Sequence, residues 1–182
     1  AEKGFVGGDQ AAEEMEETFY AMMSSLKFLP NSPTMMNAGT DKGTLSACYV
    51  LGIEDTMESI MKAATDAAMI EKYGGGIGFS LSKLRPEGFP ISTTHGKACG
   101  PIAVLRLLSG VGTMITQGGK RDGAHMAVMT VYHPDILKFI RCKEVEGEIK
   151  NFNISVGVDS DFMLAVEEDK YLFLQWPMDN KV

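Results

Sequence analysis

The sequence predicts an α/β fold with a mostly parallel sheet, and two observations carry this prediction. Strand-like segments alternate with segments of helical periodicity along the chain. Glycine-rich stretches separate several of them, as in the turns of such folds. The 182 residues are 45% hydrophobic and 23% charged, which suits one globular domain, and no apolar run is long enough to span a membrane.

The N-terminal part predicts a helix followed by an irregular stretch. The helix is expected over residues 10–26, where the large apolar side chains share one face. Pro30, Pro33 and Gly39 exclude a long helix in the stretch that follows.

The middle of the chain predicts a strand and then a well-capped helix. The strand is expected over residues 48–51. The helix is expected over residues 55–73, with Asp55 as its N-cap, Glu58 three residues later and Gly74 at its end. Its stripe of small and soft residues favours close packing against another helix.

The remaining elements alternate in the same way. Further strands are expected over residues 79–84, 127–131, 153–158 and 171–176. Further helices are expected over residues 101–115, 135–141 and 160–167. In parallel α/β folds, sites gather in loops at the carboxyl ends of strands, and we expect the glycine-rich loops to lie there.

Charge and cysteine content exclude several classes of protein. The formal net charge of −7 argues against an extended DNA or RNA surface but permits binding of a single nucleotide. Cys48, Cys99 and Cys142 form no CxxC pattern, so a disulfide scaffold or a zinc site is not expected. These cysteines fit a reducing, cytoplasmic compartment, and the three scattered histidines predict no metal site.

Four segments could carry chemistry, and each has a simpler structural interpretation. The four glycines within residues 74–78 allow close approach of a ligand, or merely end a helix in a turn. The cationic glycine-rich loop 117–124 suits phosphates, or is a solvated loop. The hydroxyls of Ser32 and Thr34 could bind phosphate, or cap a helix. Cys48 is a reactive thiol or a small core residue.

The order of these segments is more specific than any one of them. The succession NSPTMMNAGT, LSACYVL, EDTMES, YGGGIGFSLSKLRPEG, QGGKRDGAHM, HPDILKFI and NFNISV resembles the large catalytic subunit of ribonucleotide reductases, most closely the adenosylcobalamin-dependent group. The resemblance implies a ten-stranded α/β barrel in two half-barrels. Residues 1–29 would be a helical N-terminal segment, and residues 30–182 most of the first half-barrel. We expect both ends of the chain to be cut, with the radical-carrying cysteine beyond Val182.

The resemblance also implies the residues of a substrate site. Cys48 resembles the first member of the redox-active cysteine pair, which reduces the 2′-carbon of the ribose and forms a disulfide with a cysteine further downstream. Ser32 resembles a ligand of the substrate phosphate. Ala47 with Cys48 would line the substrate pocket, and Gly76 would contact the substrate through its backbone.

A second, regulatory site for a deoxynucleoside triphosphate is implied as well. Asp55 resembles the residue at the effector's deoxyribose or base, and Arg85 a ligand of its triphosphate, with Lys72 assisting. Gln117 and Arg121 belong to a loop that resembles the specificity loop between effector and substrate. The identity of the bound effector would then set the choice of substrate.

Partners and cofactors follow from the same resemblance. It implies a ribonucleoside diphosphate or triphosphate substrate, adenosylcobalamin bound mainly outside this segment, a thioredoxin-like reductant, and a homodimer that meets at the helix over residues 55–73. It implies no DNA, RNA or membrane partner, and the 182 residues alone should be inactive. The alternatives are a related subunit that needs a di-metal radical partner, a non-catalytic nucleotide-binding remnant of the barrel, and a plain structural α/β domain.

Overall fold

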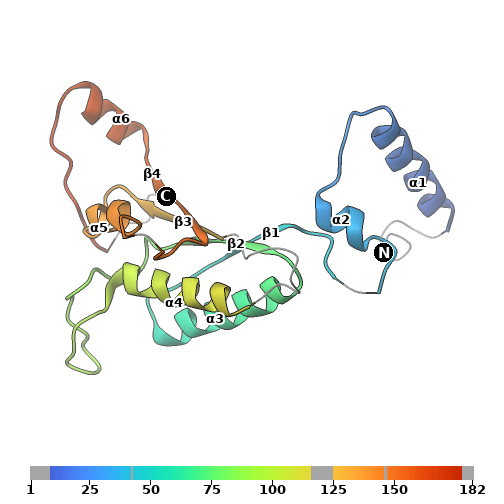
Figure 1. The fold of residues 1–182 in the computed structure, drawn as a ribbon. Coiled ribbons are helices and arrows are strands. Elements are labelled where there is room, and N and C mark those ends of the chain that lie inside the picture. Colours follow the sequence, from blue (N-terminus) through green and yellow to red (C-terminus); the bar gives the residue numbers. More distant parts are fainter. Residues whose placement is uncertain (1–8, 42, 116–124, 146, 178–182) are drawn as a thin grey trace. The chain divides into compact units, whose positions relative to one another are not determined.

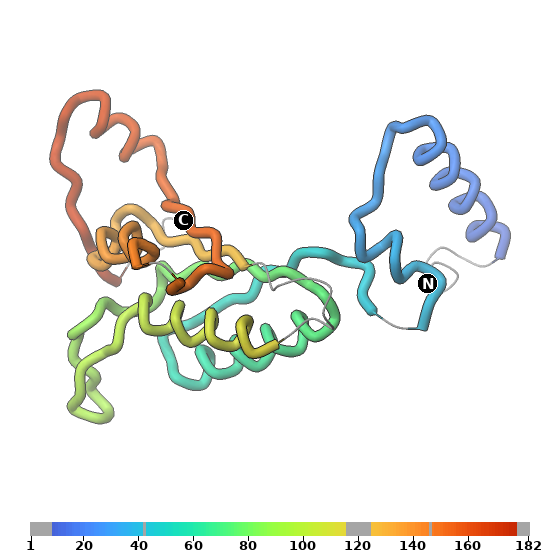
Figure 2. The backbone as a smooth tube through the Cα atoms, in the orientation of Figure 1, coloured from blue at the N-terminus to red at the C-terminus, as the bar shows by residue number. Residues whose placement is uncertain are grey.

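The computed structural model of the protein describes residues 9–41, 43–115, 125–145 and 147–177 (Figures 1 and 2). The chain divides into two compact units, Ala1–Ala47 and Cys48–Val182. The described part of the first unit contains the helices α1 (Asp9–Ser24) and α2 (Ser32–Asn37). The second unit contains a sheet and four helices among its described residues.

Local hydrogen bonds shape the first unit. The predicted first helix is confirmed as α1, which ends shortly before Leu26, a residue with a positive φ of 58°. Asn31 caps α2, because its side chain accepts a hydrogen bond from the Thr34 backbone N–H at 2.9 Å. The Thr34 hydroxyl donates to the Leu45 carbonyl at 2.6 Å. Thr34 therefore contributes to the structure of its own loop.

The sheet of the second unit is parallel throughout, as the alternation of elements predicted. Its strands lie in the order β1-β2-β3-β4. Their bounds are Cys48–Leu51, Gly76–Ser80, His125–Thr130 and Phe152–Gly157. Cys48 pairs with Gly76, Ile77 with His125, and His125 with Phe152.

Two of the helices, α3 (Met57–Lys72) and α4 (Gly100–Met114), lie side by side against one face of the sheet (Figure 1). The buried alanines of α3 allow this close packing, and α4 contributes larger apolar residues to the same core. The shorter α5 (Ile136–Arg141) and α6 (Ser160–Glu167) follow β3 and β4. The core lies between the sheet and the α3–α4 pair and extends to the buried face of α5.

Three predictions about the elements were wrong. Thr56, and not Asp55, caps α3: its side chain accepts from Ser59 N at 3.1 Å, while Asp55 is engaged elsewhere. Strand β2 begins at Gly76 rather than at residue 79, because the glycines themselves pair with β1. Residues 171–176 form no strand. The backbone hydrogen bond seen in that segment runs from Gln175 N to Tyr132 O, outside any strand ladder.

The glycine-rich run also lies at the edge opposite to the one expected. It connects the end of α3 to the start of β2, which is the amino edge of the parallel sheet. Gly74 ends α3 with a φ of +86°. A Cβ on Gly75 would lie 2.5 Å from Ile70 Cγ2 and 2.8 Å from a Tyr49 ring carbon. The glycines therefore stop a helix and allow close packing.

Across the described segments, every helix is too short or too polar to cross a membrane.

Candidate functional site

The predicted site residues of the second unit lie at two opposite edges of the sheet. Cys48 and Gly76 begin β1 and β2 and pair with each other at the amino edge. Asp55 and Arg85 follow the same two strands at the carboxyl edge. These strands have 4 and 5 residues, so about 13–17 Å of strand separates the two edges.

At the amino edge, Cys48 is a free and exposed thiol. Ala47 precedes it directly, and Gly76 on the neighbouring strand is half-buried. Ser32 belongs to the other unit, where it is the first residue of α2. The structure thus places an exposed thiol beside the glycine backbone of the neighbouring strand.

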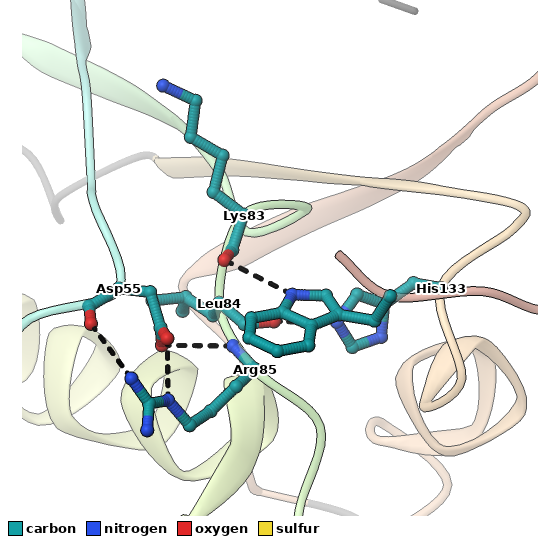
Figure 3. Close-up of polar contacts among 6 residues, drawn as sticks. Asp55, Lys83, Leu84, Arg85 and His133 are labelled. Carbon is teal, nitrogen blue, oxygen red and sulfur yellow. Dashed lines mark hydrogen bonds and ion pairs between the residues drawn. The ribbon is translucent and has the colours of Figure 1, made fainter. Parts of the chain in front are cut away.

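At the carboxyl edge, Asp55 and Arg85 form a two-point ion pair (Figure 3). One carboxylate oxygen of Asp55 accepts from Arg85 Nε at 2.5 Å, and the other accepts from the Arg85 backbone N–H at 3.0 Å. The Asp55 side chain is 22% exposed and that of Arg85 is 29% exposed. The pair is therefore shielded from solvent more than an ordinary surface salt bridge, and it fixes the direction of the guanidinium.

A cavity of about 570 Å³ opens beside this pair. Its lining combines the Asp55–Arg85 pair, the hydroxyls of Thr93 and Thr94, and apolar side chains that include Ile60. Its volume lies within the range of small-molecule sites, roughly 300–1,000 Å³.

The first residues of two long helices also line the cavity. They are Met57 and Glu58 of α3, and Gly100 of α4. Cys99, the N-cap of α4, makes no capping hydrogen bond through its side chain. Helix N-termini and a guanidinium both attract anions. The cavity therefore presents two helix N-termini and one guanidinium to an anion, beside the carboxylates of Asp55 and Glu58 and an apolar wall.

Sequence reasoning missed the group that holds the Arg85 segment from the other side. His133 is fully buried, and its Nε2 lies 2.8 Å from the Leu84 carbonyl oxygen. Asp135 is also buried and accepts from the Glu87 backbone N–H at 2.7 Å. The available signal was the His-Pro-Asp sequence directly after a predicted strand, where polar residues often carry function.

A second missed feature is a buried contact between the side chains of Glu71 and His125 near the amino edge. Glu71 Oε1 lies 3.1 Å from His125 Nε2, and both side chains are 1% exposed. Apart from this contact, their carboxylate and ring nitrogen atoms have no hydrogen-bond partner among the described residues. The His125 ring lies 4.8 Å from that of Phe152, and Gly112 leaves the space that the ring occupies. Nothing in the local sequence distinguished Glu71 from an ordinary surface residue.

Two matches to known domains decide the family. Residues 46–182 match the barrel domain of ribonucleotide reductase, and residues 2–43 match its all-alpha domain. The chain belongs to the ribonucleotide reductase family. The resemblance inferred from the sequence is thereby confirmed, together with its α/β barrel-type fold.

Individual ribonucleotide reductases show the same relationship. The chain is 46% identical over 165 residues to the vitamin B12-dependent ribonucleoside-diphosphate reductase of Thermoplasma acidophilum, covering 90% of this chain and 22% of that protein. It is 44% identical over 167 residues to the enzyme of the same description in Mycobacterium tuberculosis strain H37Rv, covering 91% and 24%. The ribonucleoside-diphosphate reductase subunit alpha of Bacillus subtilis is 29% identical, with 95% and 25% covered.

A solved structure shares the fold. The class Id ribonucleotide reductase alpha subunit of Actinobacillus ureae matches with a TM-score of 0.73 at 24% identity, covering 91% of this chain and 29% of that chain. At this identity the likeness concerns the fold alone. The chain spans about a quarter of the length of the curated relatives it matches.

Within this ribonucleotide reductase domain, the predicted effector residues are only partly brought together. Asp55 and Arg85 are in contact. Lys72 is the last residue of the 16-residue helix α3, at the end away from Asp55, and its Nζ lies 5.6 Å from the centre of the Tyr73 ring. Gln117 and Arg121 lie outside the described residues. Of the predicted effector residues that the structure describes, Asp55 and Arg85 line the carboxyl-edge cavity and Lys72 does not.

Proposed function

We propose that this chain is part of the catalytic subunit of a ribonucleotide reductase, which converts ribonucleoside diphosphates to 2′-deoxyribonucleotides for DNA synthesis. The observation that carries the proposal is the match of residues 46–182 to the barrel domain, with an exposed thiol at the predicted position. The named relatives are ribonucleoside-diphosphate reductases, which supports a diphosphate substrate.

Cys48 is proposed to supply reducing equivalents. Replacing the 2′-hydroxyl by hydrogen releases water and consumes two electrons and two protons, which two thiols provide when they form one disulfide. Cys99 lies at the other edge of the sheet, and burial raises the pKa of the Cys142 thiol. Neither suits the role of a second reactive thiol, so the partner of Cys48 is proposed to lie elsewhere in the protein. Ser32, Ala47 and Gly76 are proposed to bind the substrate.

Adenosylcobalamin is the proposed cofactor, because the relatives with 44–46% identity are vitamin B12-dependent. Within the described residues, no three His, Cys, Asp or Glu side chains form a group that could hold a metal ion. We assign no residue of this chain to the cofactor, whose proposed role is to generate the radical. The residues of this chain contribute the thiol and the nucleotide-binding groups.

The carboxyl-edge cavity is the proposed site of a deoxynucleoside triphosphate effector. Arg85 and the N-terminus of α4 suit its phosphates, and Asp55 suits a hydroxyl or base donor. Gln117 and Arg121 are proposed to sense the substrate base. Lys72 is proposed to assist, and because it lies far along α3 from Asp55, its assignment depends on a homodimer that meets at α3. A thioredoxin-like reductant and a cytoplasmic location complete the proposal, and the three free cysteines fit a reducing compartment.

The decisive experiment is an assay of ribonucleotide reduction by the full-length protein. It is run without oxygen, under a dithiol, with and without adenosylcobalamin. Turnover only with the cofactor supports the proposal. Turnover that instead requires a metal-loaded partner subunit would keep the proposed reaction and replace the radical source. No turnover under either condition would favour a non-catalytic nucleotide-binding barrel.

A further inference from the structure

The short segment of residues 84–87, which carries Arg85, is held by contacts from two neighbouring loops. On one side, Asp55 from the loop after β1 accepts hydrogen bonds from the Arg85 backbone N–H and Nε. On the other side, His133 from the loop after β3 contacts the Leu84 carbonyl (Figure 3), and Asp135 from the same loop accepts from the Glu87 backbone N–H. Three loops of the carboxyl edge thus meet at residues 84–87.

The first contact from the β3 loop fixes the protonation of a buried histidine. The Asp135 backbone N–H donates to His133 Nδ1 at 3.0 Å, so that nitrogen carries no proton. The proton therefore lies on Nε2, which donates to the Leu84 carbonyl at 2.8 Å. His133 is fully buried, so both of its nitrogens are engaged in positioning backbone groups.

The second contact fixes the other end of the segment. Asp135 accepts from the Glu87 backbone N–H at 2.7 Å, and Lys138 lies 3.0 Å from the other carboxylate oxygen of Asp135. Gly100 packs directly onto Glu87, since a Cβ on Gly100 would lie 2.9 Å from the Glu87 nitrogen. Gly100 therefore lets α4 pack closely against Glu87, where a side chain at position 100 would clash.

We infer that His133 and Asp135 are positioning residues that hold Arg85 in the orientation in which its guanidinium binds the phosphates of a nucleotide effector. The inference rests on the proposed effector site. Neither residue lines the cavity, so neither is required to touch the ligand. Their effect passes through the backbone of residues 84 and 87, one residue before Arg85 and two residues after it.

The inference predicts a particular pattern in a double-mutant cycle. Arg85→Gln removes the cation, whereas His133→Asn keeps the δ acceptor for Asp135 N–H but is too short to reach the Leu84 carbonyl. If His133 acts through Arg85, the two effects overlap: the double variant binds no more weakly than Arg85→Gln alone. A merely structural role for His133 gives effects that add.

The experiment measures the dissociation constant of a deoxynucleoside triphosphate for the full-length protein by calorimetry. We expect Arg85→Gln to weaken binding by about tenfold or more, and His133→Asn by about fivefold to tenfold. His133→Gln keeps a donor at the ε position and should restore binding to within about twofold. Arg141→Gln, an exposed change on α5, is the matched control and should bind as the parent protein does.

The results separate a failure of the inference about His133 and Asp135 from a failure of the proposed effector site. The inference is overturned if His133→Asn binds the effector as tightly as the parent protein. It is also overturned if the loss of affinity in the double variant is the sum of the two single losses. In both cases the effector site itself still stands. Binding by Arg85→Gln that equals the parent removes the effector site itself. If thermal unfolding shows that His133→Asn does not fold, Asp135→Ala, which frees the Glu87 N–H, takes its place in the same cycle.

Discussion

The two edges of the sheet are built in different ways, although the same two strands carry both. At the carboxyl edge, the loops after β1, β2 and β3 are joined by hydrogen bonds between side chains and backbone, centred on Arg85. At the amino edge, an exposed thiol lies beside glycine backbone, and the nearby polar pair Glu71–His125 is sealed in the core. The difference separates an edge organised to fix a cation from an edge organised to leave a thiol accessible.

The largest effect is expected when a substitution removes the thiol at the amino edge. Cys48→Ser should lower ribonucleotide reduction by the full-length protein by about three orders of magnitude or more, because a hydroxyl cannot form the disulfide. Product formation under a thioredoxin-like reductant measures the loss. The matched control is Cys142→Ala, which changes a buried thiol outside the proposed site and should keep turnover. Equal loss in both variants would contradict the special role of Cys48.

The next effect concerns the buried pair below that edge. Glu71→Leu should destabilise the barrel domain by up to about 3 kcal/mol, because it leaves the polar ring of His125 buried without its polar neighbour. The midpoint of thermal unfolding of the full-length protein measures the change. Replacing both residues, Glu71→Leu with His125→Leu, should recover much of the loss, since no polar group is then left unpaired. A double variant as unstable as Glu71→Leu would show that the cost arises from packing.

A smaller effect tests the close packing at the carboxyl edge. Gly100→Ala should cost about 1–3 kcal/mol, because its Cβ would meet the Glu87 backbone and because Gly100 has a φ of +77°. Gly110→Ala lies on the same helix, where nothing is within 4 Å of the added Cβ, and should be neutral or slightly stabilising. Unfolding midpoints of the two variants give the comparison. Equal midpoints would mean that α4 moves away from Glu87 at little cost.

The smallest expected effect concerns a hydrogen bond between Tyr132 and Asp159, which follow β3 and β4. The hydrogen bond from the Tyr132 hydroxyl to Asp159, 2.7 Å long, raises the pKa of Tyr132 to about 12 and lowers the pKa of Asp159. A tyrosine pKa that is raised by folding contributes stability below its ordinary value near 10.0 and loses that contribution as the pH rises toward 12. The ultraviolet titration of the parent protein minus that of Tyr132→Phe should show one tyrosine that ionises near pH 12. Ionisation near pH 10 would contradict the contact.

The sequence predicted the parallel α/β order, and it located β1 and α6 at the residues where the structure has them. It failed where a distant partner decides the outcome. Asp55 fits an N-cap by local spacing, but Arg85, thirty residues later, engages its carboxylate. Residues 171–176 have the composition of a strand but pair with no described strand. Glu71 lies in a charged stretch at the end of α3, so its burial depends on a sheet that forms later in the chain.

The shortness of β1 limits how this part of the gene can vary. Only four residues in β1, from Cys48 to Leu51, are paired with β2. Successive side chains of a strand point to opposite faces, so inserting or deleting one residue there would turn the thiol to the other face of the sheet or shift Asp55 out of reach of Arg85. Related sequences should therefore tolerate changes of residue type in β1, such as at the 85% exposed Val50, but not changes in its length.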